Sequence, residues 1–215
     1  MKSISISNLE FLRIKDQSTH EIYYGCDQEW FFTEWQRNSG CGPSVASNII
    51  LYMLNKGNIR EVCQKDNCKN QCLLLMEEVW SHVTPTQEGI PTTKMFCDLV
   101  LPYIKSRGLD CDYKMMDLPE DKNSRPDILE VLSFLEEALL KDSPVAFLNL
   151  CNGAEKNLEG WHWVTIISLE HVDDTKQAHI HILDEGQLKK IDFKLWYDTT
   201  TRDGGFVYFT VSSHI

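Results

Sequence analysis

Apolar residues recur at helical spacing through most of the first half of the chain. The spacing predicts helices over Cys41–Gly57, Ile59–His82, Thr93–Ser106 and Pro126–Lys141, with Thr92 or Thr93 as the cap of the third and Pro126 in the first turn of the fourth. Three other segments lie between and before these helices: a strand-like Ser3–Lys15, an aromatic-rich loop over Glu21–Asn38, and a strand over Cys111–Leu118.

From Pro144 onward the pattern changes to short β-rich runs that are separated by Asn, Asp and Gly clusters. Strands are predicted over Pro144–Leu150, Trp161–His171, Ala178–Leu183, Leu188–Phe193 and Phe206–Ser212, with a short helical turn at Phe193–Tyr197. Helices first and strands second predict an α+β fold with a mostly antiparallel sheet. We expect one domain over residues 1–215, with a mainly helical lobe over about 1–142 and a sheet lobe over about 143–215.

Charge and composition narrow the classes of partner. The chain has 21 basic and 32 acidic side chains, a formal net charge of −11, which argues against a nucleic acid or an anionic membrane as partner. The amino terminus has no apolar core of signal-peptide length, and the longest strongly apolar run, Ile49–Leu54, is too short to span a bilayer. We therefore expect a soluble, cytoplasmic protein whose eight cysteines are mostly free thiols.

Three of these cysteines, Cys63, Cys68 and Cys72, fall within one predicted helix and raise the question of a metal site. Their spacing places Cys68 and Cys72 on one helical face but leaves Cys63 well round the cylinder. No Cys-x-x-Cys pair or nearby histidine pair completes a tetrahedral set. We expect no metal and no cofactor.

Cys41 lies in a setting that favours a nucleophile. Gly40, Gly42 and Pro43 surround it at the predicted start of a buried helix. The glycines allow close approach of a substrate, proline is accepted in a first helical turn, and the positive end of a helix favours a thiolate. The alternative is that Cys41 is one more buried, unreactive cysteine.

A cysteine nucleophile needs an imidazole and a group that orients the imidazole. His162 opens a predicted strand and shares a face with Val164 and Ile166, so a polar ring begins an apolar row. Trp161 and Trp163 are expected on the other face, either shielding the rim of a site or packing. The alternative for His162 is a core histidine that bonds to the backbone.

Asp184 ends the next predicted strand in register with Ile180 and Ile182. A hairpin near residues 172–177 brings this end beside the start of the strand of His162, so the two side chains are expected to pair. The alternative for Asp184 is the first residue of a turn. His179 and His181 fall on the opposite face and are expected to be solvated edge residues.

These residues occur in an order that resembles the papain-like cysteine peptidases, and within them the branch related to the double-glycine peptidases that trim bacteriocin leaders. The shared segments are Ser39–Ser44, Glu88–Pro91, Ser143–Ala146, Gly160–Val164 and Ile182–Gly186. The resemblance implies a papain-like fold with a thiolate at Cys41, a general base and acid at His162, and an orienting carboxylate at Asp184. It also implies an oxyanion donor at Gln36, one residue nearer to the cysteine than is usual in the family.

The function predicted from these residues is a cysteine peptidase that cleaves peptide or isopeptide bonds in a peptide or protein substrate through a thioester. Two alternatives stay open. The same residues can serve an amidase or an acyltransferase, because the fold and the nucleophile do not decide the acceptor. A catalytically silent binding module would keep the cleft without the chemistry.

Overall fold

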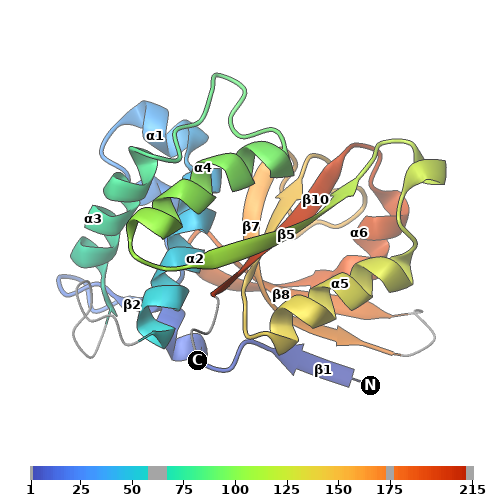
Figure 1. Ribbon diagram of the computed structural model, residues 1–215, viewed down its shortest axis with the longest axis horizontal. Helices are drawn as coiled ribbons and strands as arrows, with labels where there is room; N and C mark the ends of the chain where they lie inside the picture. Colours follow the sequence, from blue (N-terminus) through green and yellow to red (C-terminus); the bar gives the residue numbers. More distant parts are fainter. Residues whose placement is uncertain (1, 58–66, 173–176, 212–215) are drawn as a thin grey trace.

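The computed structural model describes residues 2–57, 67–172 and 177–211, and it places a helical half beside a large sheet (Figure 1). The sheet has seven strands in the order β5-β10-β6-β7-β8-β9, and β1 also pairs with β7. All of these pairs are antiparallel. The strands are β1 (Lys2–Ser5), β5 (Cys111–Leu118), β6 (Val145–Asn149), β7 (His162–His171), β8 (Ala178–Asp184), β9 (Gln187–Asp192) and β10 (Gly204–Val211).

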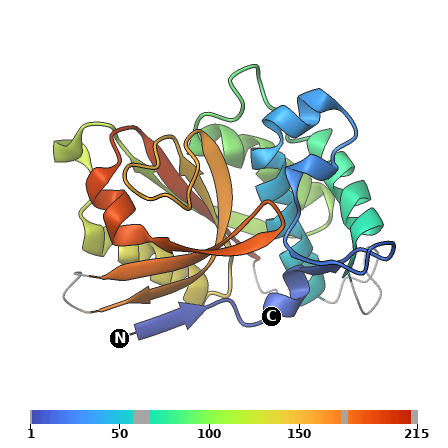
Figure 2. The same cartoon turned by 180° about the vertical axis from the view of Figure 1, so that it is seen from behind.

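Helices α1 and α3 lie at one side of this sheet, whereas α2, α4, α5 and α6 contact its strands (Figures 1 and 2). None of the helices in the described ranges combines the length and the apolarity that spanning a bilayer requires. The helices are α1 (Glu34–Ser39), α2 (Cys41–Lys56), α3 (Lys69–Trp80), α4 (Thr93–Ser106), α5 (Ile128–Leu140) and α6 (Phe193–Thr199).

A second, three-stranded sheet joins the amino-terminal segment to the helical half. Its strands are β2 (Arg13–Lys15), β3 (Ile22–Tyr24) and β4 (Asn67–Cys68), and short 3-10 turns occur at η1 (Leu9–Leu12), η2 (Gln28–Trp30) and η3 (Lys122–Ser124). The backbone N–H of Tyr24 donates to the carbonyl of Gly186 over 2.8 Å. This bond ties the small sheet to the turn between β8 and β9.

Strand β7 is buried on both of its faces because different helices cover them. Trp163 stacks on Phe96 of α4 with ring centroids 4.5 Å apart. On the alternate positions, Val164 pairs with Phe147, whose ring meets Trp196 of α6 at 4.7 Å. The start of β7 is therefore held between two packed layers, which fixes the position of the residues that begin it.

Helix α2 is the central element of the helical half, and every residue from Gly42 to Leu54 is buried. Two of its buried polar side chains, Ser47 and Asn48, form hydrogen bonds within the protein. Ser47 Oγ donates to the carbonyl of Pro43, and Asn48 joins α2 to two other segments. The Asn48 side chain accepts from the N–H of Cys26 over 2.7 Å and donates to Thr165 Oγ1 over 3.1 Å.

The predicted α+β architecture with an antiparallel sheet is confirmed, and several boundaries match closely. Helix α2 begins at Cys41, Thr92 caps α4 by accepting from the N–H of Met95, and β5 spans Cys111–Leu118 as predicted. Two strands of the main sheet, β1 and β5, come from the half of the chain that is predicted to be mainly helical.

Other boundaries differ from the prediction, each for a local reason. The segment predicted as one strand over Ser3–Lys15 is interrupted by η1, which Asn8 caps by accepting from the N–H of Glu10. Pro126 precedes α5, because Asp127 is the N-cap and forms a capping box with Glu130. Cys68 belongs to β4 and precedes α3. The predicted helix start at Ile59 lies outside the described residues.

Asn48→Ala should destabilise the fold by about 2–4 kcal/mol, because it removes the hydrogen bonds to the N–H of Cys26 and to the hydroxyl of Thr165 and opens a cavity. Urea unfolding measures this loss. Asn70→Ala, at an exposed position in the first turn of α3, is the control and should change stability by less than about 0.5 kcal/mol. Equal effects of the two variants would contradict the linking role of Asn48.

Candidate active site

Cys41 is the first residue of α2 and is half-buried. Gly40 is the N-cap residue and has no side chain that could accept a hydrogen bond from the first N–H groups of the helix. Both neighbouring glycines lie so close to other atoms that a side chain at either position would clash. A Cβ on Gly40 would lie 2.4 Å from the carbonyl oxygen of Gln36, and one on Gly42 would lie 2.8 Å from Ile90 Cδ1. The thiol therefore stands at an uncapped helix N-terminus in a tightly packed turn.

His162 begins β7, is 8% exposed, and connects Cys41 with Asp184. Its Nε2 donates to Asp184 Oδ1 over 2.7 Å. The side chain of Cys41 lines the same small cavity as the imidazole and raises its pKa. Because Nε2 is engaged by the carboxylate, Nδ1 is the nitrogen that serves the thiol. The structure thus brings together three of the four residues that the sequence indicates.

The charges of this group support one another. Burial alone would lower the pKa of His162, but the contacts with Asp184 and then with Cys41 raise that pKa well above its usual value. Burial alone would raise the pKa of Asp184, but the contacts with His162 and then Lys189 hold it below its usual value. The arrangement therefore favours a protonated imidazole between the carboxylate of Asp184 and the sulfur of Cys41.

A small cavity of about 10 Å³, room for roughly one water molecule, lies beside Cys41 and His162. Two buried oxygen atoms on its lining, Gln28 Oε1 and Ser44 Oγ, have no hydrogen-bond partner among the described residues. Unpartnered buried polar atoms are rare and call for a ligand or a water. The lining residues are Cys26, Gln28, Cys41, Ser44, Val45, Asn48, His162, Trp163, Leu183, Asp184 and Glu185.

Gln36, the fourth residue that the sequence indicates, is not on the lining of this cavity. Its Oε1 accepts from the N–H of Thr33 and closes a capping box at the start of α1. Its Nε2 donates to Glu77 Oε2 over 2.6 Å. Both ends of the Gln36 amide are therefore engaged, the oxygen in capping α1 and the nitrogen in joining α1 to α3.

Gln28 was missed by the reasoning from sequence and is the glutamine that borders the cavity. It opens the 3-10 turn η2, which Asp27 caps by accepting from the N–H of Glu29. The Asp27-Gln28-Glu29 sequence indicates a capped turn, but the fold alone brings this turn to Cys41. Rotating the Gln28 amide about its last torsion exchanges Oε1 and Nε2, so the same side chain can offer a donor.

The two tryptophans beside His162 have different surroundings. Trp163 is buried, and its Nε1 donates to the carbonyl of Ile90 over 2.8 Å. Trp161 is 59% exposed, has a φ of +56°, and lies under the guanidinium of Arg202 at 5.3 Å. Trp163 is therefore a core residue, whereas Trp161 stands on the surface directly before His162.

The histidines of β8 differ from the prediction of solvated edge residues. The strand lies between β7 and β9, and both His179 and His181 are half-buried. The His181 ring shares a hydrogen bond with Ser168 Oγ at 2.8 Å, and burial lowers its pKa. These two side chains are part of the sheet and do not join the cavity of Cys41.

Other cysteines have surroundings unlike that of Cys41. Burial raises the pKa of Cys97 to about 12 and that of Cys111 to about 11, so both stay thiols near neutral pH. Cys151 is half-buried, and a hydrogen bond with the Thr201 hydroxyl lowers its pKa to about 7. Within the described ranges, no group of three or more His, Cys, Asp or Glu side chains is placed to hold a metal ion, and Cys63 lies outside those ranges.

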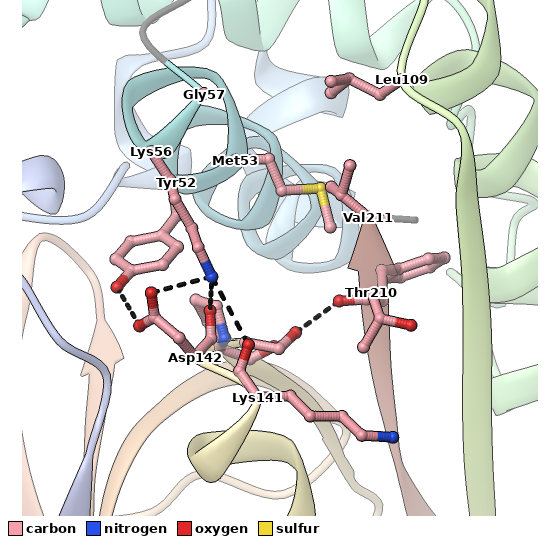
Figure 3. Close-up of a pocket in the computed structure, with 12 residues that line it drawn as sticks. Tyr52, Met53, Lys56, Gly57, Leu109, Lys141, Asp142, Thr210 and Val211 are labelled. Carbon is pink, nitrogen blue, oxygen red and sulfur yellow. Dashed lines mark hydrogen bonds and ion pairs between the residues drawn. The ribbon is translucent and has the colours of Figure 1, made fainter. Parts of the chain in front are cut away.

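A larger hollow of about 530 Å³ lies at the opposite end of α2, around Met53, Lys56 and Asp142 (Figure 3). Its polar groups bond to one another. Lys56 Nζ pairs with Asp142 Oδ2 at 2.8 Å, and Tyr52 donates to the same carboxylate over 2.5 Å. This hollow has no nucleophile with a base beside it, so the smaller cavity at Cys41 is the candidate active site.

Comparisons with known proteins agree with the fold. The chain is similar to the solved structure of UfSP from C. elegans, with a TM-score of 0.57 at 11% sequence identity. The likeness covers 99% of this chain and 35% of that one, so this chain spans about a third of the length of UfSP. At this identity it shows the fold alone, which is papain-like. No protein-family model and no curated protein matches the sequence.

Iodoacetamide should alkylate Cys41 in preference to the other cysteines at about pH 6, because the protonated His162 stabilises the adjacent thiolate. Cys151 is the competing thiol, and below its pKa its thiolate fraction falls about tenfold for each pH unit. Peptide mass spectrometry measures both sites.

His162→Ala should slow labelling of Cys41 at this pH and leave that of Cys151 unchanged. Cys151→Ser should remove the competing label and leave the labelling of Cys41 unchanged. Labelling of Cys41 that is insensitive to His162→Ala would contradict the assignment of His162 as its partner.

Proposed function

We propose that this protein is a cysteine peptidase that cleaves peptide or isopeptide bonds through Cys41, His162 and Asp184. The observation that carries the proposal is the buried hydrogen bond of His162 with Asp184 on the cavity that Cys41 also lines, at the uncapped end of α2. The papain-like fold supports it, because the three residues come from elements on the two sides of the molecule. The branch of double-glycine peptidases stays a prediction from the motifs alone.

In the proposed reaction, Cys41 Sγ attacks the carbonyl carbon of the scissile bond and the carbonyl oxygen takes the negative charge. The imidazolium of His162 then gives its proton to the leaving amine, and a thioester to Cys41 remains. Water attacks the thioester while His162 takes its proton, and the carboxylic acid and the free thiolate are released. Asp184 keeps the imidazole in the orientation that both proton transfers need.

For the oxyanion, we propose the backbone N–H of Cys41 as one donor and the side chain of Gln28 as the second. The unpartnered amide end of Gln28 at the cavity supports this choice. Gln36 stays the alternative that the family resemblance implies. To serve, its Nε2 would have to leave Glu77, with which it bonds over 2.6 Å.

The same residues could hydrolyse an amide other than a peptide bond, or pass the acyl group to an amine rather than to water, so an amidase or acyltransferase is the second candidate. Peptide cleavage with a dilute primary amine as acceptor separates a transferase from a hydrolase, because a transferase forms mainly the acylated amine whereas a hydrolase forms mainly the carboxylic acid. A silent binding module would give neither product and would leave Cys41 unlabelled by a peptidyl vinyl sulfone.

Cys41→Ala should abolish cleavage of a peptide library, read by mass spectrometry, while the protein keeps its melting temperature within a few degrees. His162→Ala should reduce the rate more than Asp184→Asn by about tenfold or more, because the first removes the base and the second only misorients it. His82→Ala, at an exposed histidine after α3, is the matched control. If all three site variants behave like this control, the proposed function is wrong.

Gln28→Ala should slow acylation on the order of a hundredfold with little change in substrate binding, because it removes one oxyanion donor. Gln36→Ala should instead lower stability by about 1–2 kcal/mol through loss of the capping box, with a smaller effect on acylation. Burst-phase kinetics and urea unfolding of both variants provide the comparison. A large acylation defect in Gln36→Ala, without one in Gln28→Ala, would assign the role of oxyanion donor to Gln36.

A further inference from the structure

Asp184 has a second charged partner besides His162. Lys189 Nζ donates to Asp184 Oδ2 over 2.7 Å, while His162 occupies Oδ1 at the same distance. Lys189 also reaches Glu185 Oε2 at 3.1 Å. Each oxygen of the Asp184 carboxylate thus accepts a hydrogen bond from a different basic side chain.

The hairpin between β8 and β9 makes this contact a built feature of the fold. Asp184 pairs with Gln187 across a two-residue turn of Glu185 and Gly186, which have φ values of +50° and +70°. Such a turn matches the twist of the strands and fixes their register. Lys189 therefore faces Asp184 at a position that the backbone determines.

Burial strengthens the ion pair between Lys189 and Asp184. The Asp184 side chain is 2% exposed and that of Lys189 is 23% exposed, so water screens the pair only in part. A buried carboxylate with a single charged hydrogen bond would keep one oxygen without a counterpart, at a cost in desolvation. Lys189 supplies that counterpart without touching the space where a substrate would lie at Cys41.

We propose that Lys189 is a positioning residue of the active site, which holds Asp184 Oδ1 toward His162 and limits how strongly the carboxylate stabilises the protonated imidazole. This role rests on the proposed function of Cys41 and His162. Lys189 acts through Asp184 and does not touch the reacting atoms.

The other charged groups nearby set the sign of the expected effect. Cys41 faces His162 from α2, and Glu185 and Lys189 flank Asp184 from the hairpin. Asp27 faces the same turn, and its pKa is raised by burial and then by Glu185 and Glu29. The groups beside Lys189 in a shallow surface hollow are Lys156, Glu159 and Lys190. Loss of the positive charge of Lys189 makes this mainly acidic surrounding more negative at His162.

A more negative surrounding favours the imidazolium, so Lys189→Met should raise the pKa of His162 further, by roughly one unit. The titration is read from the NMR signal of the His162 ring, which is assigned by its loss in His162→Ala. Lys189→Arg, which keeps the charge, should return the titration toward that of the unmodified protein. Lys190→Met is the control, since Lys190 pairs with Glu170 instead.

An unchanged His162 titration in Lys189→Met, or an equal shift in Lys190→Met, would overturn the proposal. If Lys189→Met does not fold, Lys189→Gln gives the same comparison with a polar side chain. The titration needs no turnover and no alkylation of Cys41. If Lys189→Met shifts the His162 titration but the unmodified protein cleaves no peptide, the proposed function is wrong and the role of Lys189 stands.

Discussion

The contact between His162 and Asp184 is the interaction on which the rest of the site depends. It joins the start of β7 to the end of β8, and its 2.7 Å length is possible only because the antiparallel register brings those two ends together. Both side chains are nearly inaccessible to water. A buried ionised pair is costly unless its remaining groups are also satisfied, and here Cys41 and Lys189 satisfy them.

The site also requires the helical half to pack closely on the sheet. Helix α2 must present its first turn to the beginning of β7, and Asn48 fixes the distance between them through Thr165. The loop before His162 is held by Asn149, whose Nδ2 donates to the carbonyl of Glu159 over 2.5 Å and whose Oδ1 accepts from Trp196. Rigid elements thus carry each of the three side chains, which is what preorganised chemistry requires.

Much of the site can be predicted from sequence because strand parity is local. His162 and Asp184 begin and end apolar rows of alternate residues, and a hairpin is enough to bring them together. Parity fails farther along β7, where a bulge between Ile166 and Ser168 places Leu169 opposite Ile180. Helix α2 was also predictable, because its glycines, proline and apolar run are all local signals.

Gln28 could not be predicted because its position at the cavity comes from the packing of distant segments. Gln28 reaches the cavity only because the turn of Glu185 and Gly186 binds Tyr24 just before it. Gln36 has the sequence position that the family resemblance implies, yet Thr33 beside it and Glu77 from α3 take both ends of its amide. The spacing of residues along the chain does not reveal these tertiary contacts.

The central claim is that Cys41 and His162 form one coupled acid-base pair. The most direct measurement is the NMR titration of the His162 ring before and after Cys41 is capped with methyl methanethiosulfonate in a Cys151→Ser background. Capping removes the negative charge of the thiolate, so the account predicts that the pKa of His162 falls by at least about one unit. An identical titration in the free and the capped protein would contradict it.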